Sequence, residues 1–545
     1  MLVFQTRPVL LDYGIAEKFI SKQLREYTKI KNGEIKDTEE AIGVLSEVIN
    51  GIQEKLTNRI LQENTYDSLL KLLWIFDEIH SRYLKEKEAR VKISQKRFFN
   101  EELTSIFAEN RNVMRYVIDA CNVWIENCIL LQHDVDIKSI DIKKMFVLDR
   151  ALLSDLLLYG IASHTMSLLM LSRNKDMKCP YYGINVDTKK IIPIEPIKYH
   201  PYIYYDTVIT GNQNILSPIP LAADANDTDF GKGFKKETDI EFLLFLATVY
   251  AFQANELNSD DKSLRIISKK EFINIVEHST NPAISGSVFF DNFVLSKEKL
   301  QNHLRKDECI IWVMGANKYR LELRPFICLD DENIIVPYGT LEQAKQLWVS
   351  YQSNGGMCYT HPAKMDPIKE SLDRKNTELS NVLLQRIRET LLASYTNPTV
   401  NLVDVRYDRI FGEKEIDYGD YDVIFFSSEA KELFLIEAKY FSDSLNASGI
   451  VTDYEKMYQA NGYYDHCRHR YDLVIKEKEK LKEFLGIEDS VKLHMLFVSS
   501  KPLEMDLKDE DEMVTILPLD LLDMYLHGKL LDGETGNIVE TKWVI

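Results

Sequence analysis

Apolar residues recur every three or four positions through most of the first 175 residues of the chain. The repeat is clearest in three long segments, residues 38–62, 66–92 and 101–132. A period near 3.6 residues is typical of helices that bury one face and expose the other. The pattern therefore predicts an α-helical module over residues 1–175.

The most apolar segment of the chain, residues 156–172, contains His164 and several hydroxyl side chains and is flanked by Asp155 and Arg173. A helix that spans a bilayer needs about 20 mainly apolar residues. We therefore expect a buried helix here and no membrane association. The N-terminal residues also lack a basic region followed by an apolar stretch, so no signal peptide is expected.

Between residues 179 and 220, Tyr, Ile and Pro become frequent, which disfavours helices and favours short strands. A helix is then expected over residues 341–351. These features predict a mixed α/β module over residues 176–360. Three β-rich runs predict its small sheet, at residues 308–315, 319–329 and 333–339.

Within this module, Thr238 and Glu241 have the spacing of a helix-capping box ahead of the apolar run 241–252. We expect Thr238 to cap a largely buried helix. Residues 229–233, Asp-Phe-Gly-Lys-Gly, lack the spacing of a phosphate-binding motif and predict a loop ahead of that helix.

The last third of the chain has a third pattern, which begins with apolar residues at helical spacing from Ile368 to Leu391. Three β-rich runs follow, at residues 401–410, 422–426 and 433–441. A short polar turn joins the second and third runs, so we expect them to form an antiparallel hairpin.

A helix containing residues 457–474 and a strand at residues 491–500 are expected after the hairpin. The predicted order is then helix, strand, strand, strand, helix, strand. We assign it to a third domain spanning residues 361–545.

Composition and charge narrow the functional classes. The seven cysteines include no CxxC pair and have no histidines at zinc-binding spacing, which favours a reducing, cytoplasmic setting. The net charge is −18, and residues 401–545 contain 17 Lys and Arg against 31 Asp and Glu. This balance argues against a strongly basic, non-specific nucleic-acid binder. Bound divalent cations can still offset the field where a phosphate binds.

Candidate chemistry lies in the predicted hairpin. Glu437 and Lys439 are two residues apart, so both side chains leave the same face of their strand. Asp422 begins the neighbouring strand and is expected at the same face. Hard oxygen ligands of this kind bind Mg²⁺ or Mn²⁺. The metal lowers the pKa of a bound water, and the lysine can steady the negative charge that gathers on a phosphate.

Asp422 followed by Val-Ile-Phe-Phe, and then Leu-Phe-Leu-Ile-Glu437-Ala-Lys439, resembles the motif of the PD-(D/E)xK nuclease superfamily. The predicted element order also resembles that family's restriction-endonuclease-like αβββαβ core. The resemblance implies that Asp422 and Glu437 are metal ligands and that Lys439 is the catalytic lysine.

Two further elements extend the resemblance. Gln459 and Tyr463, four apart on the expected helix, resemble the QxxxY element of RecB-like members, which implies a place at the site. Glu378, on the helix before the first strand, stands where many relatives carry an additional acidic ligand. It is therefore the third metal ligand that the resemblance implies.

The first acidic ligand has alternatives, because no proline precedes Asp422 and three other carboxylates are nearby in the sequence. These are Glu415, Asp417 and Asp420. The Glu437–Lys439 pair is better defined, because an apolar strand leads into it and the expected elements flank it on both sides.

The sequence thus predicts a multidomain α plus α/β protein that acts as a Mg²⁺- or Mn²⁺-dependent nuclease. DNA is the expected substrate, and RNA remains an alternative, as do endonuclease and exonuclease action. The large N-terminal region, residues 1–360, implies regulation or targeting of the nuclease. The domain organisation resembles that of prokaryotic restriction or phage-defence effectors. A homo-oligomer or an ATPase or helicase subunit is a further expected partner. The alternative from another class is a nucleic-acid-binding scaffold with a structural nuclease fold.

Overall fold

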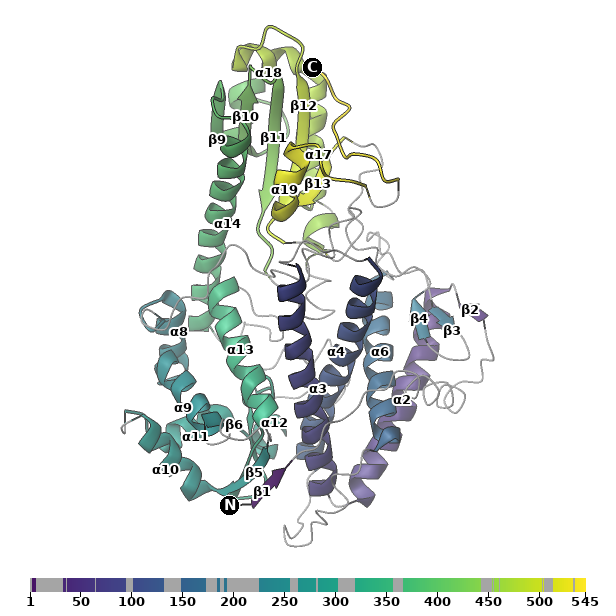
Figure 1. Cartoon of the computed structure of the whole chain (residues 1–545), viewed down its shortest axis with the longest axis vertical. Helices are drawn as coiled ribbons and strands as arrows, with labels where there is room; N and C mark the ends of the chain where they lie inside the picture. The colour runs from purple at the N-terminus through teal and green to yellow at the C-terminus, as the bar shows by residue number, and fades with distance from the viewer. Residues whose placement is uncertain are drawn as a thin grey trace.

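A computed structural model of the chain shows a C-terminal unit, green and yellow at the top of Figure 1, standing above a broader front part. Helix α14 (Asp366–Ser394) runs between the two. The structure describes residues 2–5, 33–35, 37–63, 65–94, 101–131, 149–172, 184–186, 191–193, 225–254, 263–280, 283–301, 319–355, 366–442, 453, 455–459, 461–501, 503, 513–532 and 535–545.

Four long helices dominate the described part of the first 172 residues, and they include the three helices predicted there. The apolar segment 156–172 lies in the last of them, and its residues from Leu156 to Tyr159 are buried. Among the described residues, no helix has the length and apolar character needed to cross a membrane. The four helices are α2 (Thr38–Gln62), α3 (Thr65–Ser94), α4 (Glu101–Leu130) and α6 (Arg150–Ser172).

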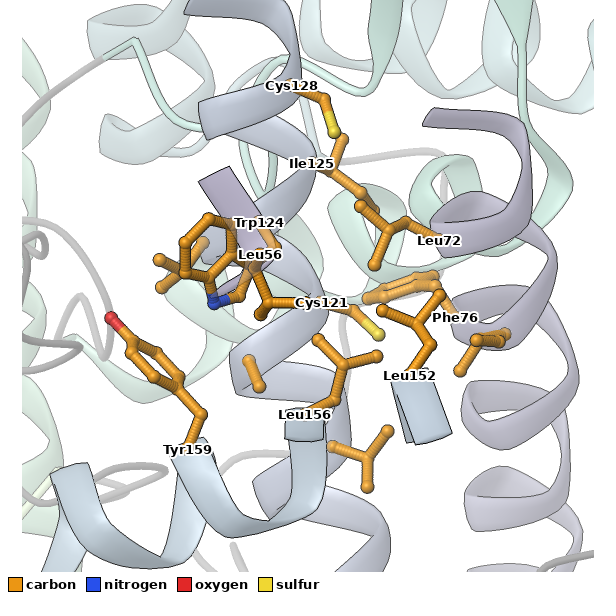
Figure 2. Close-up of a cluster of buried hydrophobic side chains, with 14 of the residues drawn as sticks. Leu56, Leu72, Phe76, Cys121, Trp124, Ile125, Cys128, Leu152, Leu156 and Tyr159 are labelled. Atoms are coloured by element: carbon orange, nitrogen blue, oxygen red, sulfur yellow. The ribbon is translucent and has the colours of Figure 1, made fainter. Parts of the chain in front are cut away.

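The core between these helices is dense (Figure 2). Trp124 of α4 meets Tyr159 of α6 edge to face, with 5.7 Å between ring centroids. A Cβ at Gly160 would lie 2.3 Å from the carbonyl oxygen of Tyr116, so glycine permits the close approach of α6 to α4. Cys121, in the same core, is a buried free thiol.

A five-stranded sheet lies beside the helices, in the order β1-β5-β8-β7-β6. Its first strand pairs antiparallel with a strand from the middle of the chain, so that Leu2 lies opposite Ile266. A smaller sheet has the order β2-β3-β4. The strands are β1 (Leu2–Gln5), β2 (Gly33–Ile35), β3 (Ile184–Val186), β4 (Ile191–Pro193), β5 (Ser263–Ser268), β6 (Val294–Leu295), β7 (Phe326–Cys328) and β8 (Asn333–Val336).

The helices of the middle segment enclose a core rich in phenylalanine, in which Phe234, Phe245 and Trp348 are fully buried. The predicted strand at residues 319–329 is present only from Phe326, because residues 321–323 form a turn. Residues 308–315 lie outside the described part. The helices are α8 (Asp229–Thr238), α9 (Phe242–Ala254), α10 (Lys269–Ser279), α11 (Gly286–Phe293), α12 (Lys297–Gln301) and α13 (Tyr338–Asn354).

The predicted capping box was wrong. Thr238 ends α8, and its hydroxyl donates to the carbonyl oxygen of Phe234 at 2.8 Å. The side chain of Asn226 instead accepts from the backbone N–H of Leu243 in the first turn of α9, at 3.0 Å. A capping group from a distant segment satisfies the helix end equally well, and local spacing does not reveal it.

Residues 229–233 are also helical, contrary to the predicted loop. They form the first turns of α8, with Thr228 as the N-cap. A Cβ at Gly233 would lie 2.5 Å from the carbonyl oxygen of Pro367. Glycine therefore serves close packing between α8 and the start of α14.

The C-terminal unit contains a five-stranded sheet with the order β13-β12-β11-β10-β9. The predicted hairpin is confirmed: β10 and β11 pair antiparallel, and β11 then runs parallel to β12. The elements from α14 to β12 include the predicted order of helix, three strands, helix and strand. The strands are β9 (Val400–Arg406), β10 (Asp420–Ser427), β11 (Glu432–Lys439), β12 (Lys492–Ser499) and β13 (Thr515–Pro518).

Helices cover both faces of this sheet. On one face α14 and α19 (Leu519–Leu526) pack on Phe425, Phe434 and Ile436. The other face carries α15 (Asp408–Phe411), α17 (Tyr463–Lys476) and α18 (Lys478–Leu485). The alternation of side chains along β11 thus assigns odd-numbered residues to the α17 face.

Helix α14 contributes to two cores. Near its start, Ile368 and Leu372 pack into the phenylalanine-rich core of the front part. Further along, Leu383 and Ile387 pack on the C-terminal sheet. Arg374, between the two regions, pairs with Asp229 at the start of α8, with 2.6 Å between nitrogen and oxygen.

Candidate functional site

The hairpin brings Asp422 and Glu437 together. Val423 lies opposite Ile436 in the β10–β11 register, so the preceding residue of β10 lies opposite Glu437. Opposite residues of an antiparallel pair share a face. Both carboxylates are largely removed from solvent, with exposed fractions of 9% for Asp422 and 3% for Glu437.

Lys439 lies between these two carboxylates. Its Nζ atom is 2.7 Å from Oε1 of Glu437 and 3.2 Å from Oδ2 of Asp422. The same Oδ2 accepts the backbone N–H of Ala438 at 2.7 Å. The three residues that the sequence places at the centre of the site are therefore in direct contact.

Helix α17 adds a second cation, Arg470, which the sequence analysis did not assign to the site. Its Nη2 atom pairs with Oε2 of Glu437, and its Nη1 atom donates to the carbonyl oxygen of Asp420. Its side chain is buried. Glu437 thus has one cation on each carboxylate oxygen.

Two more carboxylates stand beside Asp422. One ligand oxygen from each of Asp404, Asp420 and Asp422 lies within 4.8 Å of the others. Asp404 comes from the edge strand β9, where its φ of 50° is in the left-handed region. Asp can adopt this conformation at a low cost.

The electrostatics of the site follow from burial. Loss of solvent, followed by the charge of Glu437, raises the pKa of Asp422 to about 6. Burial lowers the pKa of Lys439, but the charges of Glu437 and Asp422 raise it by more, so the ammonium form is favoured. Crowded, desolvated carboxylates are stabilised when a cation binds between them.

The donor set fits a divalent metal ion. Carboxylate oxygens are the ligands that Mg²⁺ prefers, and each of the three aspartates offers one oxygen within 4.8 Å of the others. The four carboxylates of the site exceed the two cations, Lys439 and Arg470, by two charges. Asp404, Asp420 and Asp422 would hold the ion, with Glu437 beside them.

The QxxxY prediction is only partly matched by the geometry. Tyr463 lies at the site, with the Lys439 Nζ atom 5.7 Å from its ring centroid. Gln459 is exposed in a bend before α17, and the single helix predicted over residues 457–474 was wrong. Asn461 has a φ of 62°, and α17 begins only at Tyr463, after Gly462. The Asn-Gly pair is a turn signal that outweighs the helical spacing.

Glu378 lies elsewhere. It is exposed on α14 and pairs with Lys375 one turn earlier, at 2.9 Å. Helix α14 covers the face of the sheet opposite α17. Of the alternatives for the first acidic residue, Asp420 joins the cluster, whereas Asp417 pairs with Arg406 and Glu415 is exposed.

Comparison of the chain with protein-family models, with curated proteins and with solved structures found no match.

Proposed function

We propose that the chain is a metal-dependent nuclease that hydrolyses phosphodiester bonds in DNA, with a restriction-endonuclease-like C-terminal unit as its catalytic part. The observation that carries this proposal is the contact of Lys439 with both Asp422 and Glu437, beside a cluster of three aspartates. Asp422 and Glu437 are buried, Asp420 is half-buried and Asp404 is exposed, so the charged groups extend from the interior to the surface, where a substrate can reach them.

Each group has a place in the chemistry. A bound Mg²⁺ or Mn²⁺ ion supplies a more acidic water and neutralises charge on the phosphate. Asp422 and Glu437 hold the ammonium group of Lys439 beside the aspartate cluster, so it can donate to a phosphate oxygen or orient the attacking water. The ring of Tyr463 covers this ammonium on one side.

The test is cleavage of supercoiled plasmid, of linear single- and double-stranded DNA and of RNA with Mg²⁺ or Mn²⁺. We expect Lys439→Met and Asp422→Asn to lower the cleavage rate about 100-fold or more, as loss of a charge-stabilising group does in other active sites. The plasmid products distinguish nicking from exonuclease action.

The matched control is Lys431→Met. Lys431 is the lysine of another Glu-x-Lys triplet, Glu429-Ala-Lys431, and lies in the turn of the same hairpin, where its side chain is 59% exposed and pairs with Asp489. This variant should cut at the wild-type rate. Wild-type protein that binds nucleic acid but cuts none of these substrates would favour the scaffold function. Full activity of Lys439→Met would show that the active site lies at other residues.

A further inference from the structure

Arg470 contacts two of the three strands that carry carboxylates of the site. Its two terminal nitrogens reach different strands, Nη2 to the Glu437 carboxylate on β11 and Nη1 to the Asp420 carbonyl oxygen on β10. A guanidinium group is planar, so its two donors have a fixed separation and direction. A single side chain thus bridges the ends of β10 and β11 that carry Asp420 and Glu437.

The backbone that carries Arg470 is itself held in place. The hydroxyl of Tyr421 donates to the Arg470 carbonyl oxygen at 3.1 Å. The hydroxyl of Tyr471 lies 3.0 Å from the carbonyl oxygen of Leu435 and 2.9 Å from that of Leu496. These contacts attach α17 to three strands of the sheet, so Arg470 extends from a fixed frame.

We propose that Arg470 is a positioning residue of this site, which holds Glu437 and the first residue of β10 in the arrangement that metal binding requires. This inference rests on the proposed function, because it assumes that the site binds the metal ion of a nuclease. By occupying Oε2 of Glu437, Arg470 leaves Oε1 for Lys439. By holding the Asp420 carbonyl, it keeps the carboxylate of that residue near Asp422.

The loop before β10 provides an independent means of testing this contact. Gly419 has a φ of 75°, and a Cβ there would lie 3.1 Å from the Nη1 atom of Arg470. Gly412, in the same loop, has a φ of 74° and has no atom within 4 Å of such a Cβ. Alanine is strained at both positions, and Gly412, with a ψ of 171°, is in a region that is essentially restricted to glycine. Only Gly419→Ala also crowds the guanidinium group.

The experiment is calorimetric titration of the full-length protein with Mn²⁺ alone, without nucleic acid. We expect Arg470→Lys, which keeps the charge, to weaken Mn²⁺ binding 10- to 100-fold, the usual effect of losing a residue that orients metal ligands. Arg470→Gln should also weaken binding, although removal of a positive charge alone would strengthen it. The control is Arg386→Lys, at an exposed arginine of α14 that pairs with Glu389.

If Arg470→Lys does not fold, the comparison of Gly419→Ala with Gly412→Ala still tests the positioning role of Arg470. Gly419→Ala should weaken Mn²⁺ binding several-fold relative to Gly412→Ala. The inference would be overturned if Arg470→Lys bound Mn²⁺ with wild-type affinity, or if Arg470→Gln bound it more tightly than wild type. Equal Mn²⁺ affinities of Gly419→Ala and Gly412→Ala, or a wild-type protein that binds no Mn²⁺, would also overturn it. Wild-type protein that binds Mn²⁺ but cuts no nucleic acid would overturn the proposed nuclease function only. Weaker binding in Arg470→Lys would then still support the positioning role.

Discussion

Glu437 is a buried carboxylate whose two oxygens meet two different cations, Lys439 and Arg470. Removing Glu437 leaves the buried guanidinium of Arg470 without its carboxylate, and breaking a buried ion pair in this way costs about 3–5 kcal/mol of stability. Substitutions at the site therefore need a stability measurement beside the activity measurement. Glu437→Gln, which keeps the shape, is a better variant than Glu437→Ala.

His494 on β12 is a second buried group with consequences at the residue scale. Its ring stacks on Phe434 with 4.3 Å between centroids, and its Nδ1 atom lies 2.9 Å from the Tyr525 hydroxyl oxygen. Burial, followed by the charge of Lys492, lowers the pKa of His494 to about 3. The imidazole is therefore neutral in the folded chain at all ordinary pH values.

This depressed pKa predicts a loss of stability in acid. Above pH 6.5 His494 is neutral in both states and contributes no pH dependence. As the pH falls from 6.5 toward 3, the unfolded chain takes up a proton that the folded chain does not, so the free energy of unfolding declines by up to about 1.4 kcal/mol per pH unit. Urea denaturation of wild type and His494→Phe between pH 8 and 5 should show a shallower slope for the variant.

His527→Gln provides the comparison for this experiment, because His527 is exposed. It should retain the wild-type slope. Parallel pH profiles for wild type and His494→Phe would contradict the assignment of a neutral buried imidazole.

At the scale of elements, the sequence predicts best where neighbours in the chain are neighbours in space. The β10–β11 hairpin and the contacts of Lys439 with Asp422 and Glu437 follow from a short turn and the alternation of side chains. Arg470 belongs to a basic cluster with His466, Arg468 and His469, for which the sequence leaves phosphate contact and a solvated helix face equally open. Its buried ion pair with Glu437 depends on tertiary packing and could not be predicted. Asp404 lies in the edge strand β9, and its own backbone has a left-handed φ of 50°, which the sequence does not reveal.

The break between residues 459 and 463 was predictable in principle, and it leads to a prediction about Gly462. A Cβ at this position would lie 2.6 Å from the carbonyl oxygen of Met457 and 2.8 Å from that of Gln459. Gly462→Ala should therefore lower the free energy of unfolding by about 1–3 kcal/mol, measured by chemical denaturation. Because α17 would shift, Mn²⁺ binding should weaken as well.

At Gly43, in contrast, alanine is expected to raise the free energy of unfolding. Gly43 is exposed within α2, and a Cβ there would meet no atom within 4 Å. Alanine should stabilise the helix by up to about 1 kcal/mol. A Gly462→Ala variant as stable as Gly43→Ala would show that the turn before α17 has room for a side chain.

At the scale of the whole molecule, α14 joins the front part to the C-terminal unit. Leu372 is 4% exposed in the front core, and Ile387 is fully buried against the C-terminal sheet. A continuous helix transmits displacement along its length better than a flexible linker does. Any regulation of the site by the front part is therefore expected to depend on α14.

Leu372→Ala tests this connection. The substitution should cost about 2–5 kcal/mol in the front core. Hydrogen exchange measured by mass spectrometry should then increase in α13 and also along α14 as far as Leu391. The exposed Leu402, on β9, supplies a control, since Leu402→Ala should leave both regions unchanged. Faster exchange confined to residues before 366 would mean that the two cores open independently.

The pairing of β1 with β5 has a consequence for the protein during its synthesis. About 260 residues separate the two strands, so at translation rates of about 5–20 residues per second, residues 2–5 leave the ribosome roughly 13–50 seconds before their partner strand exists. The front sheet cannot close during this interval. The strands from β9 to β12, in contrast, all lie within residues 400–499 and meet soon after they emerge. Strands β9 to β12 can therefore pair soon after their synthesis, whereas β1 has no partner in β5 until residues 263–268 have been made.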